Sequence, residues 1–504
     1  MAVIQGTGNL AEESILIFKQ NPMKKIFIFI MPLVLAMASC EKFLDQQPIS
    51  SLSNELFWKT NEDARLGNAA IYDALQKTLS DSYIDWGDAR SDNFTYSGTG
   101  DYQILVTMNG LTSLTTTANW NDLYTTISRA NASIKNLPNI KTLSIIDRDH
   151  YLAQAHAIRA YMYFYAVRLW GAVPVWLTPY ENVNDDPKKP RSPADSVING
   201  VIIPDLTKAL TLVNKNINLV YEINQGGILA MLTDVHMWKK DYAAAITSSA
   251  QFSALPYKYD VTAATHLDYR NIFTNPATSK EAVWALNWDY VKDGGNEIAL
   301  RIGSSGNTSN YEIDSVAFLK FEADRNDIRR AVAYDTNVVN ALNDITQIWK
   351  FYDLDPITAK PKYPIRAESN AKLPLYRTAD VLLLRAEALN KTGDKAGAFA
   401  ILNKIRTLRK AKPLVPAAFT TVESVENAIL DERQMELFAE SRRWFDLVRT
   451  GKVISAMDPL IRKRQRYLRL IETGFTDPRK ILWPISRDAL TRNSLLTQNA
   501  PYSE

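Results

Sequence analysis

The sequence predicts a mostly α-helical protein in which helical hairpins recur and two irregular insertions interrupt them. Three observations support this fold class. Apolar residues return every three or four positions over several segments of helical length. Two stretches repeat the small and apolar positions of a tetratricopeptide-like helix–turn–helix unit. Between the helical segments, two long stretches lose this period and gain glycine and aromatic residues.

Five segments carry the helical period most clearly. Residue 137 is followed by a proline and residue 170 by a glycine, and both residue types end helices. The segment that ends at Gly451 is predicted to stop there for the same reason. We therefore predict helices over residues 54–79, as one helix or two, and over residues 120–137, 147–170, 197–213 and 427–451.

The hairpin pattern is clearest in the C-terminal half of the chain. The unit's small, apolar and turn positions are occupied there by Ala386, Leu389, Gly393, Ala398, Leu402 and Ile405. An earlier copy matches at fewer positions and has Thr233, His236, Lys240, Ala245, Ser249 and Phe252. Each hairpin leaves one face uncovered, so the next hairpin is expected to stack on that face and close the core.

The two insertions have the residue types of a sugar-binding site. Residues 80–117 are predicted to form a long loop or lid, and residues 257–311 an irregular segment with a short strand at 282–288. Aromatic rings can pack on the apolar faces of sugars, and Asp and Asn can bond their hydroxyls. The alternative for each ring is packing within its own loop. The candidate ligand-binding residues are Trp86, Asp88, Asn93, Tyr96, Tyr102, Trp288, Tyr290, Asn296 and Tyr311.

The N-terminal segment has the pattern of a secreted lipoprotein. Two lysines precede an apolar run of about a dozen residues, which is too short to cross about 30 Å of hydrocarbon. We therefore predict a signal peptide over residues 1–39, with Met23 as a candidate true start. Small residues precede Cys40, which is the predicted lipidation site. Residues 40–53 would then be a tether, and residues 54–504 the folded body.

The composition is that of a soluble protein with nearly balanced charge. The net charge of +3 argues against a nucleic-acid partner. A single cysteine excludes disulfides within the chain and zinc sites built from cysteines. The sequence contains 11 Trp and 23 Tyr, which is consistent with both a large aromatic core and a ligand-binding surface.

A cluster of glutamates offers the strongest sign of catalysis. Glu432, Glu436 and Glu440 are four residues apart and hence on one face of the predicted helix, and carboxylate pairs catalyse glycoside hydrolysis. Arginines such as Arg433 and Arg443 lie beside them and would favour ionised carboxylates, whereas a general acid needs a raised pKa. We therefore interpret the cluster as ion pairs between helices and predict no catalytic residue.

The remaining charged and metal-ligating residues give weaker signals. His150 and His156 are too far apart around a helix to share a metal, and the sequence has neither a zincin nor a phosphate-loop motif, so we predict no metal and no cofactor. Residues 462–469 are strongly basic. They are interpreted as a solvated helix face, with contact to acidic glycan, lipid headgroups or a partner protein as the alternative.

Four motifs in the same order resemble the SusD/RagB family of surface lipoproteins of Bacteroidetes. SCEKFLDQQP at 39–48 is similar to the family's lipidated start, and AIRAYMYFYAVRLWGAVPV at 157–175 to its helix that ends in an aromatic-Gly-x-Pro turn. DERQMELFAESRRWFDLVRTG at 431–451 resembles its most characteristic motif, and ILWPISRDALTRNSLLTQNAPY at 481–502 its C-terminus. Ser486 stands where the family usually has proline, and Ala500 with Pro501 replaces Pro-Gly.

The resemblance implies both an architecture and a role. The architecture is a solenoid of tetratricopeptide-like hairpins whose insertions form one irregular, ligand-binding face. The role is capture of oligosaccharide at the cell outer membrane and its delivery to a SusC-like TonB-dependent transporter, without catalysis. Three alternatives remain: a peptide or glycopeptide binder of the same uptake system, a glycoside hydrolase, and a scaffold that binds only proteins.

Overall fold

The segments with a helical period in the sequence form helices that pack on one another. The computed structural model describes residues 57–97, 100–182, 184–257, 259–303, 309–335, 348–360, 362 and 368–503. The expected signal peptide, Cys40 and the tether lie outside these residues. No helix in the described ranges is both long enough and apolar enough to cross a membrane.

The long helices lie in or near the predicted segments, and α5 and α6 match theirs to within two residues. In the first half they are α3 (Asn61–Trp86), α5 (Asn121–Asn136), α6 (Ile145–Trp170), α8 (Ile203–Leu212), α9 (Gln225–Trp238) and α10 (Tyr242–Ser253). In the second half they are α16 (Thr378–Lys391), α17 (Lys395–Leu408), α18 (Val422–Glu436), α19 (Arg443–Arg449) and α20 (Val453–Tyr467). Shorter helices are α4 (Asp101–Thr107), α7 (Ala194–Val197), α11 (His266–Thr274), α12 (Tyr290–Asp293), α13 (Ile298–Arg301), α14 (Ser315–Glu322), α15 (Arg330–Ala333) and α21 (Arg487–Arg492).

Polar caps and glycines set the ends of the hairpin helices. Asn224, Asp241 and Asp394 accept backbone N–H hydrogen bonds at the starts of α9, α10 and α17. Helix α6 begins at a Ser144 cap and ends at Gly171, whose φ of +72° suits glycine. These local signals explain why the predicted hairpins over α9–α10 and α16–α17 form as expected.

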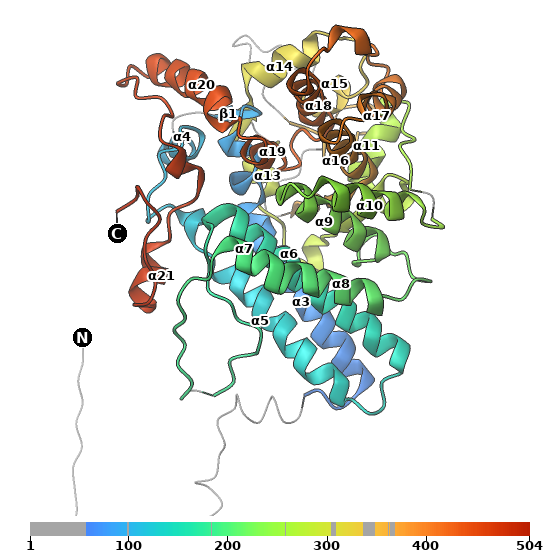
Figure 1. Cartoon of the computed structure of the whole chain (residues 1–504), viewed down its shortest axis with the longest axis vertical. Coiled ribbons are helices and arrows are strands. Elements are labelled where there is room, and N and C mark those ends of the chain that lie inside the picture. Colours follow the sequence, from blue (N-terminus) through green and yellow to red (C-terminus); the bar gives the residue numbers. More distant parts are fainter. Residues whose placement is uncertain are drawn as a thin grey trace, which may run out of the picture. The chain divides into compact units, whose positions relative to one another are not determined.

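The helices stack into the hairpin solenoid that the sequence implied. Helix α5 packs between α3 and α6, α6 packs on α8, and α8 packs on α9. The α9–α10 hairpin then packs on α16, which contacts both α17 and α18. Figure 1 shows this progression from α3, α5 and α6 through α8 to α10, and on to α16, α17 and α18. The mostly α, tetratricopeptide-like fold class is confirmed.

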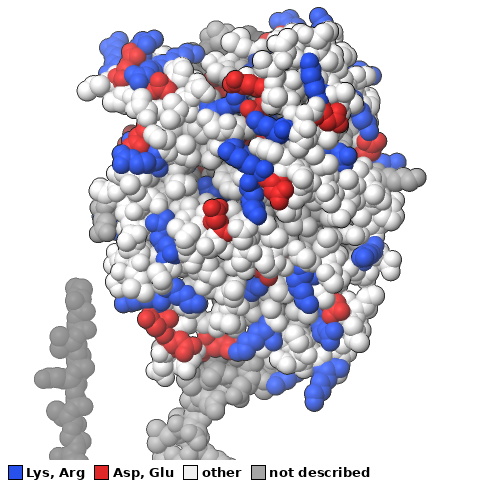
Figure 2. Space-filling view, viewed as in Figure 1, with Lys and Arg blue, Asp and Glu red and all other residues white. Residues whose placement is uncertain are grey.

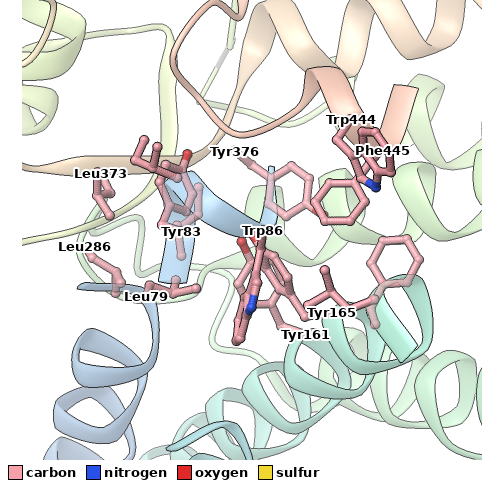
Figure 3. Packing of buried hydrophobic residues seen from close by; sticks show 14 of the residues in the cluster. Leu79, Tyr83, Trp86, Tyr161, Tyr165, Leu286, Leu373, Tyr376, Trp444 and Phe445 are labelled. Atoms are coloured by element: carbon pink, nitrogen blue, oxygen red, sulfur yellow. The ribbon is translucent and has the colours of Figure 1, made fainter. Parts of the chain in front are cut away.

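Two short antiparallel strand pairs join segments far apart in sequence. Strand β1 (Phe94–Tyr96) pairs with β3 (Tyr311–Ile313), so the two insertions meet. Strand β2 (Ala282–Leu286), which confirms the predicted strand, pairs with β4 (Leu373–Arg377) and is wholly buried. Around β2 and β4 the core is aromatic: the Tyr161 ring centroid lies 5.0 Å from that of Trp284. Figure 3 shows Tyr161, Trp86, Tyr376 and Phe445 converging there from four elements.

The first insertion is more regular than predicted. Helix α3 continues through Ser80 to Trp86, so the residues expected to begin a loop or lid are helical. Helix α4 and strand β1 then occupy much of the remainder. The extension of α3 is explained by burial, because Trp86 packs 5.6 Å from Trp170 and its Nε1 donates to Thr117 O. The sequence lacks an apolar period there because polar neighbours such as Asp85 are also buried.

The predicted helix over residues 427–451 is wrong in the middle. Helix α18 ends at Glu436, and α19 begins only at Arg443. Between them Ala439 and Ser441 have φ of 65° and 55°, which no α-helix allows. Glu440 therefore does not share a helix face with Glu436. The break is held by Asp88, whose carboxylate accepts the N–H groups of Ser441 and Arg443 at 3.0 and 3.2 Å.

A buried arginine–glutamate network ties this break to the hairpin stack. Its acids are Glu281, Glu432, Glu436 and Glu440, and its bases are Arg329, Lys350, Arg377, Arg406 and Arg409. Glu436 is at the centre, 2.7 Å from both Arg377 and Arg409 and 3.0 Å from Arg329. Burial alone would raise the pKa of Glu436, but the three guanidinium groups hold it well below its usual value.

Replacement of Glu436 tests the structural role of this network. Glu436→Gln removes the one carboxylate that three buried arginines share, and each arginine keeps only its remaining acidic partners. We therefore expect the free energy of unfolding to fall by about 3–5 kcal/mol. Glu423→Gln, on the same helix but with a side chain that is 75% exposed, is the matched control and should change it by no more than about 0.5 kcal/mol. Urea unfolding followed by circular dichroism measures both, and equal losses would contradict the role.

The network also predicts an acid-sensitive stability. Because the pKa of Glu436 is lowered in the folded protein, the unfolded chain binds more protons as the pH falls below the ordinary value of 4.5. The stabilisation is therefore complete at neutral pH and is lost as the pH falls through the folded-state pKa. Unfolding measured between pH 7 and pH 3 should show this decrease, with a smaller slope in Glu436→Gln. An identical slope in the variant would disprove the assignment.

Candidate functional site

The pairing of β1 with β3 creates one surface from the two insertions. Side chains alternate between the two faces of a strand pair. Phe94 and Ile313, which are directly opposite in register, lie on the buried face. Thr95 and Glu312 are also opposite each other and lie on the other face. That second face forms a wall of a pocket, so the pocket depends on contact between segments more than 200 residues apart.

The pocket, which we call the tyrosine pocket, lies between the strand pair and α20. Its volume is about 490 Å³, within the usual size of small-ligand sites. It is lined by Thr95, Tyr96, Glu312, Asp314, Ser315, Leu460, Lys463, Arg464 and Tyr467. Figure 2 shows Lys and Arg side chains, with some acidic ones, gathered over the region that α20 occupies in Figure 1.

Two tyrosines give the pocket its aromatic surface. Tyr467, in the last turn of α20, is 82% exposed, and Tyr96 at the end of β1 is half-buried. Partial burial raises the pKa of Tyr96, and the nearby Tyr467 raises it further, while Arg464 acts in the opposite direction. The Tyr96 hydroxyl is therefore neutral at physiological pH. An exposed ring beside a second ring is suited to packing against a flat, partly apolar ligand.

Ion pairs beneath the tyrosines hold the walls of the pocket together. Arg464 is buried and lies 2.9 Å from Asp314, at the start of α14. It also donates to Phe94 O in β1 and to Thr107 O in α4. Arg464 thus joins α20 to the first insertion and to the start of α14. The prediction of a solvated face for residues 462–469 is wrong for Arg464 but holds for the exposed Lys463 and Arg466.

The rim of the pocket carries both donors and acceptors. Lys463 donates from Nζ to Ser315 Oγ at 3.1 Å, and both residues are exposed. Glu312 is half-buried on the strand wall. An ammonium, a hydroxyl and a carboxylate around two aromatic rings can bond the hydroxyl groups of a sugar in several directions.

Most of the predicted ligand residues are buried. Six of them are buried: Trp86, Asp88, Asn93, Trp288, Asn296 and Tyr311. Asn93 donates to Asp88 at 3.1 Å, and Asn296 donates to Ala371 O at 2.7 Å. Burial raises the pKa of Asp88 to about 7, although backbone N–H donors and Asn93 oppose this. The protein therefore encloses these six side chains.

The other three predicted residues reach the surface to different degrees. Tyr96 lines the tyrosine pocket. Tyr102 is half-buried, and its hydroxyl donates to Asp85, which also accepts from Tyr311. Tyr290 is 39% exposed and lies in α12, outside the pocket lining. The structure therefore brings Tyr96, Tyr102 and Tyr311 into one region and leaves Tyr290 apart.

Sequence reasoning missed Tyr467 and the residues around it. Tyr467 lies within the basic stretch that was interpreted by its charge alone. The available signal was an aromatic residue among exposed Arg and Lys on a helix. A ring on a fully solvated face leaves apolar surface in water, so its presence there indicates a contact. Glu312 and Ser315 had no such signal, because their place beside α20 depends on the strand pairing.

The glutamates considered for catalysis are enclosed by protein. Glu432 is buried and lies 2.6 Å from both Arg329 and Arg406, and Glu440 is buried beside Lys350 and Arg377. With the lowered pKa of Glu436, these contacts match the structural interpretation of the cluster. Within the described ranges, His, Cys, Asp and Glu form no group of three or more that could hold a metal ion.

Family models and relatives cover nearly the whole chain. A model described as "Starch-binding associating with outer membrane" matches residues 42–237, and one described as "SusD family" matches residues 302–502. The chain is 32% identical to SusD-like protein P38 of Formosa agariphila, across 92% of this chain and 96% of that protein.

Solved structures share the fold. The crystal structure of a SusD superfamily protein from Bacteroides thetaiotaomicron is 25% identical, with a TM-score of 0.69 over 88% of this chain and 99% of that one. A laminarin-binding SusD-like protein, 19% identical, has the same fold with a TM-score of 0.70 over 88% of this chain and 100% of that one. The chain therefore belongs to the SusD family.

Proposed function

We propose that this protein is a surface-exposed lipoprotein that captures oligosaccharide in the tyrosine pocket and delivers it to a SusC-like TonB-dependent transporter of the outer membrane. One observation carries the proposal: an exposed tyrosine, Tyr467, faces a ligand-sized pocket that is lined by the first insertion, by β3 with the start of α14, and by α20. The family model's description as starch-binding, and a laminarin-binding protein of the same fold, support a carbohydrate ligand.

Binding would combine ring contacts with hydrogen bonds at the rim. The apolar face of a pyranose packs on Tyr467 and Tyr96, while its hydroxyls bond Ser315, Lys463 and Glu312. The open position of Tyr467 permits rapid release. Weak to moderate affinity follows, and it suits a carrier that must hand its ligand to a transporter.

The charges of the pocket favour capture without hydrolysis. A glycosidase needs two carboxyl groups on either side of the bond, one of them protonated. Of the two acids that line the tyrosine pocket, Asp314 is buried in an ion pair with Arg464. Among the residues that line the pocket this leaves Glu312, which can bond a hydroxyl, whereas glycoside hydrolysis needs a pair of carboxyl groups.

Membrane attachment in this proposal depends on Cys40. Acyl chains on its sulfur and on the new N-terminus would hold the protein at the bilayer, since each buried CH₂ contributes about 0.8 kcal/mol. The tether would leave the helical body free to meet both ligand and transporter.

Substitution of the pocket tyrosines tests the ligand site. On a glycan array and by calorimetry with the best glycan, Tyr467→Ala and Tyr96→Ala should each weaken binding about tenfold, which is about 1.4 kcal/mol. Tyr467→Phe keeps the ring and should retain most of the affinity. Tyr290→Ala is the control, because Tyr290 is exposed but outside the pocket. Signal on a peptide array alone would refute a sugar ligand and favour the peptide-binding alternative.

Substitution of Cys40 tests the anchor. Cys40→Ala should release the protein from the membrane fraction and abolish incorporation of labelled palmitate, because the acylated sulfur is lost. Met37→Leu, which alters the same segment and keeps the cysteine, should remain membrane-bound. Membrane fractionation with an antibody to the protein measures both, and a Cys40→Ala protein that still sediments with membranes would disprove lipidation at this residue.

A further inference from the structure

A second pocket with aromatic walls lies away from α20. We call it the Tyr257 pocket, and its volume is about 480 Å³. Three segments form it: the connection from α8 to α9, the segment that follows α10, and the turn that leads into β2. Its lining includes Asn218, Tyr221, Glu222, Tyr257, Tyr259 and Lys280. Figure 1 shows α10 and α20 well separated, so the two pockets are distinct.

Polar contacts hold the three tyrosines of this pocket in place. Tyr257 donates to Lys215 O, and Tyr259 donates to Asn218 Oδ1. The Ala277 backbone N–H lies close enough to the Tyr221 hydroxyl to oppose the rise in its pKa that burial causes. With their hydroxyls engaged, the rings need not be ordered when a ligand binds, which lowers the entropic cost of association.

Packing behind Tyr259 reinforces this rigidity. Its ring stacks on Phe252, with centroids 5.0 Å apart and planes 9° from parallel. A Cβ added to Gly226 would lie 2.5 Å from the Tyr259 ring, so glycine is required for this close approach. Tyr257 lies beside Tyr259, at 6.4 Å between centroids. The aromatic wall is thus built into the α9–α10 hairpin.

The polar groups at the rim favour a neutral ligand. Asn218 accepts from Tyr259 with Oδ1, and within the described ranges no group accepts from its Nδ2. Lys280 is exposed and has no carboxylate partner among the described residues, while the Glu222 side chain is 40% exposed. One positive and one negative charge give no net attraction for an anion. An amide, an ammonium and a carboxylate beside rings suit a polyhydroxylated ligand.

We propose that the Tyr257 pocket is a second sugar-binding subsite, which takes one neutral pyranose unit of a long glycan. The assignment rests on the proposed glycan-binding function and adds a separate site to it. A polysaccharide that reaches both pockets is held at two points, so its apparent affinity exceeds that of either pocket alone. A short oligosaccharide gains no such advantage.

Gel electrophoresis through embedded polysaccharide tests the subsite. The probes are soluble starch, laminarin and the glycan that gives the strongest wild-type signal on the array. In a Tyr467→Ala background, which weakens the tyrosine pocket, the added Tyr257→Ala change should reduce the remaining retention at least threefold. Added Tyr257→Phe keeps the ring and should preserve retention. Added Tyr180→Ala is the matched control, since Tyr180 is an exposed tyrosine that also donates to a backbone carbonyl.

The outcomes separate this inference from the proposed function. Retention that is equal in Tyr467→Ala with and without Tyr257→Ala overturns the subsite but leaves the function intact. Absence of any wild-type glycan signal refutes the function itself. Should Tyr257→Ala fail to fold, as judged by thermal melting, Lys280→Ala and Asn218→Ala replace it, and unchanged retention in both overturns the subsite. Peptide binding that Tyr257→Ala abolishes, with glycan retention unchanged, also overturns the sugar assignment.

Discussion

The fold depends on the buried ion pairs that Glu436 makes beside the break between α18 and α19. Glu436 is buried among Arg329, Arg377 and Arg409, and each of these arginines comes from a different part of the chain. Buried charges are stable only when they are paired and fully bonded, so these segments must meet in one arrangement. The network therefore fixes where the hairpin stack and the strand β4 sit relative to the characteristic motif at 431–451.

The same break positions the ligand-binding surface. Asp88, from the first insertion, accepts the N–H groups that the left-handed turn presents at Ser441 and Arg443. Tyr83 donates to Glu440 O in the same turn. Because the turn holds the first insertion against α19, β1 lies where β3 can pair with it and where Arg464 of α20 can reach its backbone. The tyrosine pocket is a consequence of these contacts.

The predictions from sequence succeeded where local signals decide structure. The hairpins at α9–α10 and α16–α17 follow from apolar periods and polar caps, and β2 from a short apolar alternation. The predictions failed where contacts with residues far along the chain decide the structure. Residues 437–442 have strong helix formers, yet long-range bonds to Asp88 and the buried arginines favour a turn. For the aromatic residues of the insertions the sequence left two interpretations open, ligand contact or packing within the loop, and Trp86, Trp288 and Tyr311 are buried.

By itself, the sequence determined the class of fold, the family resemblance and the presence of two aromatic insertions, because periodicity, capping residues and motifs are local properties. Only the tertiary structure decided which aromatic side chains face solvent and which three segments meet around a pocket. Burial and strand pairing arise from contacts across hundreds of residues, so Tyr467 and Tyr96 become neighbours through the fold and not through their spacing in the chain.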